Sequence, residues 1–89
     1  MNAIVTVVGQ DQVGIIAAVC IFMSENNVNI LDISQTILQS AFTMVMVVDV
    51  EQATVSLVDL AEQLDQLGKK MNVSIRIQRQ EIFDAMHRI

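Results

Sequence analysis

Seven apolar segments follow one another along the 89 residues, and their order restricts the chain to few folds. Segments rich in β-branched residues indicate strands, whereas apolar residues repeating every three or four positions indicate helices. The order is strand, helix, strand, strand, helix, strand and a short final helix, at 3–8, 12–25, 28–38, 42–50, 57–71, 73–78 and 81–89. This is the order of the split βαβ unit. We therefore predict an α+β fold, a ferredoxin-like βαββαβ sandwich with a four-stranded antiparallel sheet, two helices on one face and a short C-terminal helix.

Three local patterns sharpen this prediction. The helix at 12–25 is apolar nearly all round, which favours burial on more than one face. The strand at 28–38 has adjacent Ile30 and Leu31, which indicates either a bulge or a two-sided environment. Thr54 or Ser56 can cap the helix at 57–71, since Asp59 follows Ser56 at the spacing of a capping box.

The turn between the first strand and the first helix reads Gly9-Gln10-Asp11-Gln12-Val13-Gly14. A turn of this kind leaves backbone N–H groups free at the start of a helix, where the helix dipole favours an anion. The carboxylate of Asp11 repels phosphate and attracts ammonium, so the turn suits a zwitterion such as an amino acid. Two structural explanations remain open. Asp11 can cap a helix beginning at Gln12, and the glycines can serve a tight turn and close packing.

Charge and composition exclude several classes of protein. Residues 1–68 carry eight acidic side chains and no Lys or Arg, and the net charge is −5, so a nucleic-acid binder is not expected. No apolar run is long enough to span a membrane, and no basic segment precedes an apolar one as in a signal peptide. The single cysteine, Cys20, is expected to be a buried small hydrophobic residue. We expect a cytoplasmic protein consisting of one domain over residues 1–89.

Two segments indicate self-association. The second strand of this fold is an edge, and residues 28–38 contain no Lys, Arg or Pro to protect it. The tail at 81–89 is too short for a stable isolated helix, so it must dock on its own domain or on a partner. We predict a homodimer or a higher oligomer, assembled through the second-strand edge and the first helix.

Catalytic groups are scarce. His87 is the only histidine, and the chain has no Cys/His cluster and no serine-nucleophile or phosphate-binding lysine motif. Asp59, Glu62 and Asp65 lie three residues apart, which is better explained as a solvated helix face than as a metal site. We expect no enzyme activity, no metal and no cofactor.

The chain resembles a stand-alone ACT domain, in particular the small bacterial proteins made of one such domain. The resemblance rests on Ile4–Ile16, on the strand Asn27–Thr36 and on the tail Glu81–Ile89, and it covers the whole chain. It implies a small-molecule-binding regulatory domain, an allosteric sensor that pairs side by side and binds an amino acid between the strand–helix turn of one copy and the second strand of its neighbour. The chain has Val13 where many such turns have Pro, and we expect no attached catalytic or DNA-binding domain.

The resemblance also implies roles for particular residues. From the turn, the ligand contacts would be Asp11, Val13, Gly14 and Ile15, and from the partner's second strand they would be Asn29 and Ile30. Asp11 or a nearby carbonyl would bind the ammonium group, and backbone N–H groups with the Asn29 amide would bind the carboxylate. Asn27 is a weaker candidate because it can simply cap the preceding helix. The alternative function is a structural dimerisation or protein-interaction module without a ligand.

Overall fold

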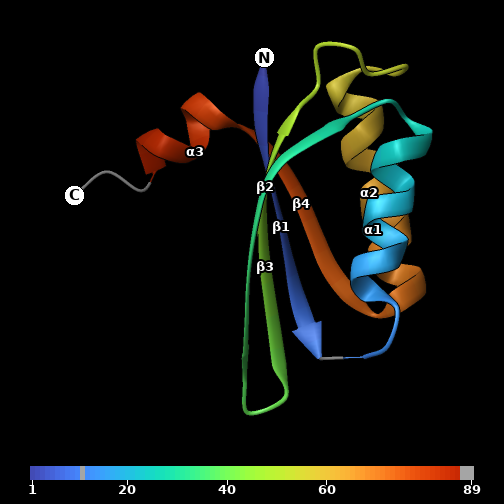
Figure 1. Cartoon of the computed structure of the whole chain (residues 1–89), viewed down its shortest axis with the longest axis vertical. Coiled ribbons are helices and arrows are strands. Elements are labelled where there is room, and N and C mark those ends of the chain that lie inside the picture. The colour runs from blue at the N-terminus through green and yellow to red at the C-terminus, as the bar shows by residue number, and fades with distance from the viewer. Residues whose placement is uncertain (11, 87–89) are drawn as a thin grey trace.

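The predicted order of elements is present in the computed structural model, which describes residues 1–10 and 12–86. Along the chain these elements are β1 (Asn2–Gln10), α1 (Ile15–Glu25), β2 (Asn29–Leu38), β3 (Ala41–Asp49), α2 (Leu57–Met71), β4 (Val73–Arg79) and α3 (Gln80–Met86). Figure 1 shows α1 and α2 on one face of the sheet and α3 on the other. Most predicted boundaries differ from these by one to three residues. Within the described residues, no helix is long and apolar enough to cross a membrane.

The four strands form one antiparallel sheet in the order β2-β3-β1-β4, which confirms that β2 is an edge strand. The pairing fixes which segments share each end of the sheet. Asn2 of β1 lies opposite Asp49 of β3, which lies opposite Asn29 at the start of β2. At the other end, Gln10 lies opposite Ala41, and Ala41 lies opposite Leu38. The turn after Gln10 therefore lies at the end of the sheet where β2 finishes, far from where β2 begins.

An irregularity in β2 follows from the two adjacent aliphatic residues noted in the sequence. The pairing with β3 shifts between Ile30 and Asp32, so Leu31 is the extra residue of a bulge, which was one of the two explanations that the broken alternation left open. The hairpin that follows turns through Gln39 and Ser40, both with positive φ, 52° and 70°. This is the backbone that a tight hairpin requires, here formed without glycine.

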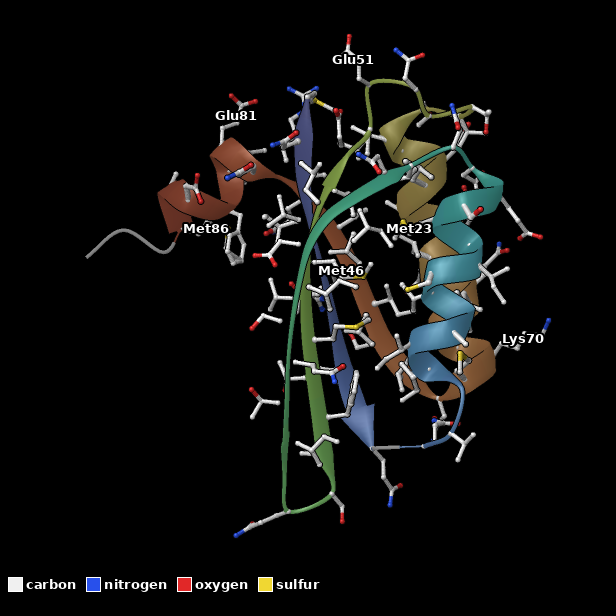
Figure 2. All side chains as sticks on the ribbon, viewed as in Figure 1. Met23, Met46, Glu51, Lys70, Glu81 and Met86 are labelled. Carbon is white, nitrogen blue, oxygen red and sulfur yellow. The ribbon has the colours of Figure 1, made fainter. Side chains whose placement is uncertain are left out.

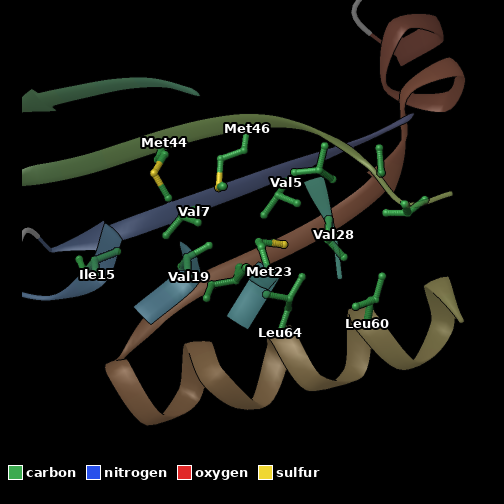
Figure 3. Packing of buried hydrophobic residues seen from close by; sticks show 14 of the residues in the cluster. Val5, Val7, Ile15, Val19, Met23, Val28, Met44, Met46, Leu60 and Leu64 are labelled. Atoms are coloured by element: carbon green, nitrogen blue, oxygen red, sulfur yellow. The ribbon is translucent and has the colours of Figure 1, made fainter. Parts of the chain in front are cut away.

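The core lies between the sheet and the two helices α1 and α2. Alternate residues of β1 and β3 point into it and are buried, and Figures 2 and 3 show Met46 of the sheet and Met23 of α1 within this layer. On α1 only Ile15, Val19 and Met23 are buried. The expected burial of this helix on more than one face is not provided by the single chain, because Ile16 and Ile21 on its other sides are exposed.

Helix α2 is capped at both ends, and the sequence predicted the cap at its N-terminus. Ser56 is the N-cap, and its hydroxyl accepts a hydrogen bond from the Asp59 N–H at 3.2 Å, as predicted. Asn72 is the C-cap in the left-handed region, which asparagine tolerates better than most residues. The predicted core face is also confirmed, with Leu60 and Leu64 buried. The acidic residues of α2 are exposed, and Asp65 pairs with Lys69 at 3.2 Å.

The tail helix α3 lies against its own sheet, on the face opposite α1 and α2 (Figure 1). It contacts β1 and β4, and the Gln78 amide lies 3.8 Å from the Met86 sulfur. Ile4 on this face of β1 is buried, although it points away from the main core. Ile82 and Met86 remain exposed, so α3 leaves part of its apolar side uncovered. His87 lies outside the described residues.

Candidate functional site

The two glycines of the β1–α1 turn have different structural roles. A Cβ on Gly9 would lie 2.5 Å from Cγ1 of Val73, so this glycine allows β1 and β4 to approach closely. Gly14 has φ 95° and is the N-cap of α1, and a Cβ there would meet no atom within 4 Å. Gly9 is therefore a packing residue, whereas Gly14 leaves open space at the start of the helix.

The start of α1 corrects one expectation from the sequence. A helix beginning at Gln12 with Asp11 as its cap is wrong, because α1 begins at Ile15 and its N-cap is Gly14. Gly14 can adopt the left-handed conformation that this sharper entry requires. Asp11 itself lies outside the described residues, so its predicted contact with an ammonium group stays a prediction.

The backbone of this turn offers hydrogen-bond donors to a ligand. The first bond within α1 runs from the Ala18 N–H to the Gly14 carbonyl at 2.9 Å, and no side chain caps the helix. The N–H groups of Ile15 and the two residues after it therefore have no acceptor within the helix. They carry the partial positive charge of the helix N-terminus.

The predicted ligand contacts of the turn differ in what they can offer. The side chain of Val13 is fully exposed, at 101%, while that of Ile15 is only 1% exposed and belongs to the core. Ile15 can therefore contact a ligand through its backbone N–H alone. Gln12 fixes the turn to the rest of the fold, since its side-chain amide donates to the Met71 carbonyl at 2.6 Å.

The other predicted contacts, Asn29 and Ile30, lie at the opposite end of α1, where they line an open pocket of about 490 Å³. We call it the amide pocket, because three carboxamide side chains lie along it. Its polar lining consists of Asn27, Asn29, Gln52, Ser24 and Cys20, and its aliphatic lining consists of Val28 and Ile30.

Hydrogen bonds hold the walls of the amide pocket together. Asn27 donates from its side chain to the Gln52 carbonyl at 2.8 Å, and Thr54 donates from its backbone N–H to the Asn26 carbonyl at 3.0 Å. Asn26 is the C-cap of α1, and Asn27 follows it with φ 58°. The weaker candidate Asn27 is thus not the cap of the helix but a link between α1 and the β3–α2 loop.

The pocket also corrects the expectation for the cysteine. Cys20 is half-buried and lines the pocket, so the prediction of a fully buried core residue is wrong. Cys20 and Ser24 lie four residues apart and share one flank of α1. That spacing could have indicated a polar flank in the sequence. Gln52 could not have been found, because only the fold brings it beside α1.

A single chain does not bring the two groups of predicted residues together. The turn and the amide pocket lie at opposite ends of the 11-residue helix α1, which is about 16 Å long at 1.5 Å per residue. A small ligand cannot span that distance. A site that uses both groups needs two copies of the chain.

Titration and metal chemistry do not mark either end as catalytic. Among the groups of residues 1–10 and 12–86, a resolved shift occurs only at the N-terminal amine, where a hydrogen bond to Glu51 raises the pKa above 8.0, assisted by the charges of Glu51 and Asp49. This amine is exposed and lies 3.0 Å from the Glu51 carboxylate. Across residues 1–10 and 12–86, no group of three His, Cys, Asp or Glu side chains could hold a metal ion.

Comparisons with known proteins agree with this architecture. A family model described as an ACT domain matches residues 2–78. The chain is 54% identical over 88 residues to a UPF0237 protein of Bifidobacterium longum, covering 99% of this chain and 98% of the relative. It is similar to the structure of an ACT domain protein from Streptococcus pneumoniae, with 42% identity, a TM-score of 0.83 and 98% of each chain covered. A structure of a putative glycine cleavage system transcriptional repressor shares the fold at 21% identity and a TM-score of 0.76, covering 89% of this chain and 45% of that one.

Proposed function

Because the chain belongs to the ACT domain family, we propose that it is an amino-acid-binding regulatory domain that acts as a homodimer on a metabolic or regulatory partner. ACT domains are ligand-binding regulatory modules that generally bind amino acids and dimerise. The proposal covers the amino-acid ligand, the dimer and the six contact residues named above, Asp11, Val13, Gly14, Ile15, Asn29 and Ile30. The cytoplasmic location stays a prediction from the sequence.

The observation that carries the proposal is the free edge of β2. This strand is paired on one side only, and its aliphatic side chains Leu31, Ile33 and Ile37 are 50%, 40% and 56% exposed. Unpaired N–H and C=O groups beside exposed aliphatic residues favour pairing with another strand. Ile16 of α1 is also exposed, on the flank that continues through Cys20 to the pocket at the start of β2. A second copy of β2 and α1 fits this surface.

The direction of such pairing determines what comes together. Two copies related by a twofold axis present the same surface to each other. Two β2 strands paired in this way run antiparallel, so Asn29 of one copy lies near Leu38 of the other. Leu38 shares its end of the sheet with Gln10 and therefore with the turn that contains Gly14. Antiparallel pairing thus places the amide pocket of one copy opposite the turn of its partner, twice in each dimer.

The two halves then have complementary chemistry for an amino acid. Backbone N–H groups at the start of α1, from Gly14 and Ile15, suit the ligand carboxylate, and the Asn29 amide of the partner adds a further donor. Asp11, as the sequence predicts, or a carbonyl of the turn accepts from the ammonium group. Val13 and the partner's Ile30 would contact the ligand at its edges.

Thermal unfolding in the presence of single amino acids, combined with sedimentation, tests this function. A ligand at about 100 times its dissociation constant adds roughly 2.7 kcal/mol to the free energy of unfolding. For a domain of this size that raises the midpoint by roughly 10–20 °C, at about 4–8 °C per kcal/mol. We expect a dimer and a clear shift with at least one amino acid. A monomer at micromolar concentration with unshifted midpoints would contradict the proposal.

One observation favours the second candidate, a ligand-free interaction module. Ile82 and Met86 of α3 are exposed on a helix that covers only one end of its sheet face. Deleting residues 81–89 would then change the oligomeric state or abolish capture of a protein partner. Under the amino-acid-binding proposal, the same deletion leaves the ligand affinity unchanged.

A further inference from the structure

The amide pocket is held open by the fold before any ligand arrives. The two hydrogen bonds from Asn27 to the Gln52 carbonyl and from Thr54 to the Asn26 carbonyl join the end of α1 to the β3–α2 loop. A third runs from the Val28 N–H to the Met23 carbonyl at 2.9 Å and fixes the chain entering β2. A pocket of about 490 Å³ lies within the range of small-molecule sites.

Several polar groups of this pocket are not used by the fold. Within the part of the chain that the structure describes, the carboxamides of Asn29 and Gln52 and the hydroxyl of Ser24 make no hydrogen bond. A carboxamide offers two donors and one acceptor with two lone pairs, and a hydroxyl offers both roles. These groups can therefore form paired hydrogen bonds with a neutral polar group of a ligand.

The lining of the pocket also contains no formal charge. No Lys or Arg occurs anywhere in residues 1–68, and the N-terminal amine at this end of the sheet is already paired with Glu51 and Asp49. Removing an ionised group from water without a partner of opposite charge is strongly unfavourable. A neutral polar group that finds hydrogen-bond partners bears no such penalty.

We infer that the amide pocket holds the side chain of the bound amino acid and selects an uncharged polar one, a carboxamide or a hydroxyl. This inference rests on the proposed function, because the partner's turn must bind the ligand's carboxylate and ammonium groups at the mouth of the pocket. Gln52 is then the specificity-determining residue, and Asn29, at the mouth of the pocket, donates to the ligand's carboxylate. Ser24 and Cys20 form the wall on α1.

Cys20 provides a direct readout, since it is the only cysteine and lines the pocket. The rate of its alkylation by iodoacetamide is measured on the full chain with each of eight amino acids, at a fixed protein concentration that keeps the oligomeric state constant. Glutamine, asparagine, serine and threonine form the neutral set, and glutamate, aspartate, lysine and arginine form the charged set. We expect at least one neutral amino acid to slow the alkylation, with an affinity at least about tenfold above that of any charged one.

A pair of matched variants tests the selectivity. Gln52→Glu places a carboxylate in the pocket, and Gln63→Glu makes the same change at an exposed position of α2. Gln52→Glu should weaken binding of the neutral ligand roughly tenfold, since a donor of the Gln52 amide is lost and a charge is placed beside the ligand, while Gln63→Glu leaves the affinity unchanged.

Four outcomes would overturn the inference, and they separate it from the proposed function. Charged amino acids that protect Cys20 as well as neutral ones do, or equal affinities of the two variants, would remove the selectivity but leave an amino-acid-binding dimer intact. Binding that shifts the unfolding midpoint without slowing alkylation would place the ligand outside the pocket. If no amino acid binds at all, the proposed function and the inference both fail.

Discussion

The two ends of α1 are built in opposite ways. At the turn, the important atoms belong to the backbone, and Gly9 and Gly14 are required because a side chain would clash or would strain φ. At the amide pocket, side chains such as Asn29 and Gln52 supply the polar groups, and the backbone beneath them is fixed by hydrogen bonds. Substitutions of the two turn glycines should therefore act mainly through stability, whereas substitutions in the pocket should act on binding alone.

The largest expected effect is at Gly9. In Gly9→Ala the new methyl group would lie 2.5 Å from Cγ1 and 2.9 Å from Cβ of Val73, so β1 and β4 must separate. Overpacking of this kind costs about 2–3 kcal/mol. Urea unfolding should show the loss through a lower midpoint. If Gly9→Ala were as stable as the parent chain, the turn would not differ from the amide pocket in its effect on stability.

Gly14→Ala should have a smaller effect, because a Cβ there meets no neighbour within 4 Å. The cost is backbone strain at φ 95°, about 1–2 kcal/mol for a residue with a side chain. Gly14→Asn serves as the control, since asparagine tolerates positive φ, and it should recover part of the loss. If both variants lose the same free energy of unfolding in this assay, then steric contact and not φ determines the cost.

At the pocket, Asn29→Ala should change binding but not stability. Asn29 is exposed, so we expect the free energy of unfolding to stay within about 0.5 kcal/mol of the parent value. Loss of its amide should lower the affinity for the amino acid roughly tenfold. The control Asn2→Ala makes the same change at an exposed position of β1. Calorimetric titration compares the two, and equal affinities would exclude Asn29 from the site.

The smallest effect concerns the N-terminal amine, which lies at the pocket end of the sheet. The hydrogen bond from this amine to Glu51 raises its pKa above 8.0. The stabilisation is present in full below pH 8.0 and is lost as the pH rises through the higher pKa of the folded state. In Glu51→Gln, an NMR titration should show the amine pKa moving down toward 8.0. An unchanged pKa would mean that Asp49, 3.8 Å away, is its principal partner.

Much of the fold was predictable because its signals are local. The bulge at Leu31 follows from two adjacent aliphatic residues, and the cap at Ser56 follows from its spacing to Asp59. The start of α1 was mispredicted because an acidic residue is a common cap, while the left-handed Gly14 that ends the turn gives only a weak sequence signal.

The site was less predictable because it depends on contacts between distant segments. Gln52 reaches the pocket only through the β3–α2 loop, and Cys20 lies on the edge of the core and not within it. The placement of α3 on the open face of the sheet also depends on tertiary packing. The sequence left open whether this helix docks on its own domain or on a partner.

The central claim is that each site combines the turn of one copy with the amide pocket of the other, and mixed dimers test it most directly. Val13→Glu adds a carboxylate to the turn at a fully exposed position, and Asn29→Ala disables the pocket. Each variant alone should bind the amino acid at least about tenfold more weakly. Val58→Glu, an exposed change on α2, is the control for the first variant.

When the two variants are unfolded together and refolded as a mixture, half of the dimers are mixed, and each mixed dimer has one intact site. Calorimetric titration should then recover full affinity at about one quarter of the sites. A mixture that binds no better than either variant alone would contradict a site shared between two copies.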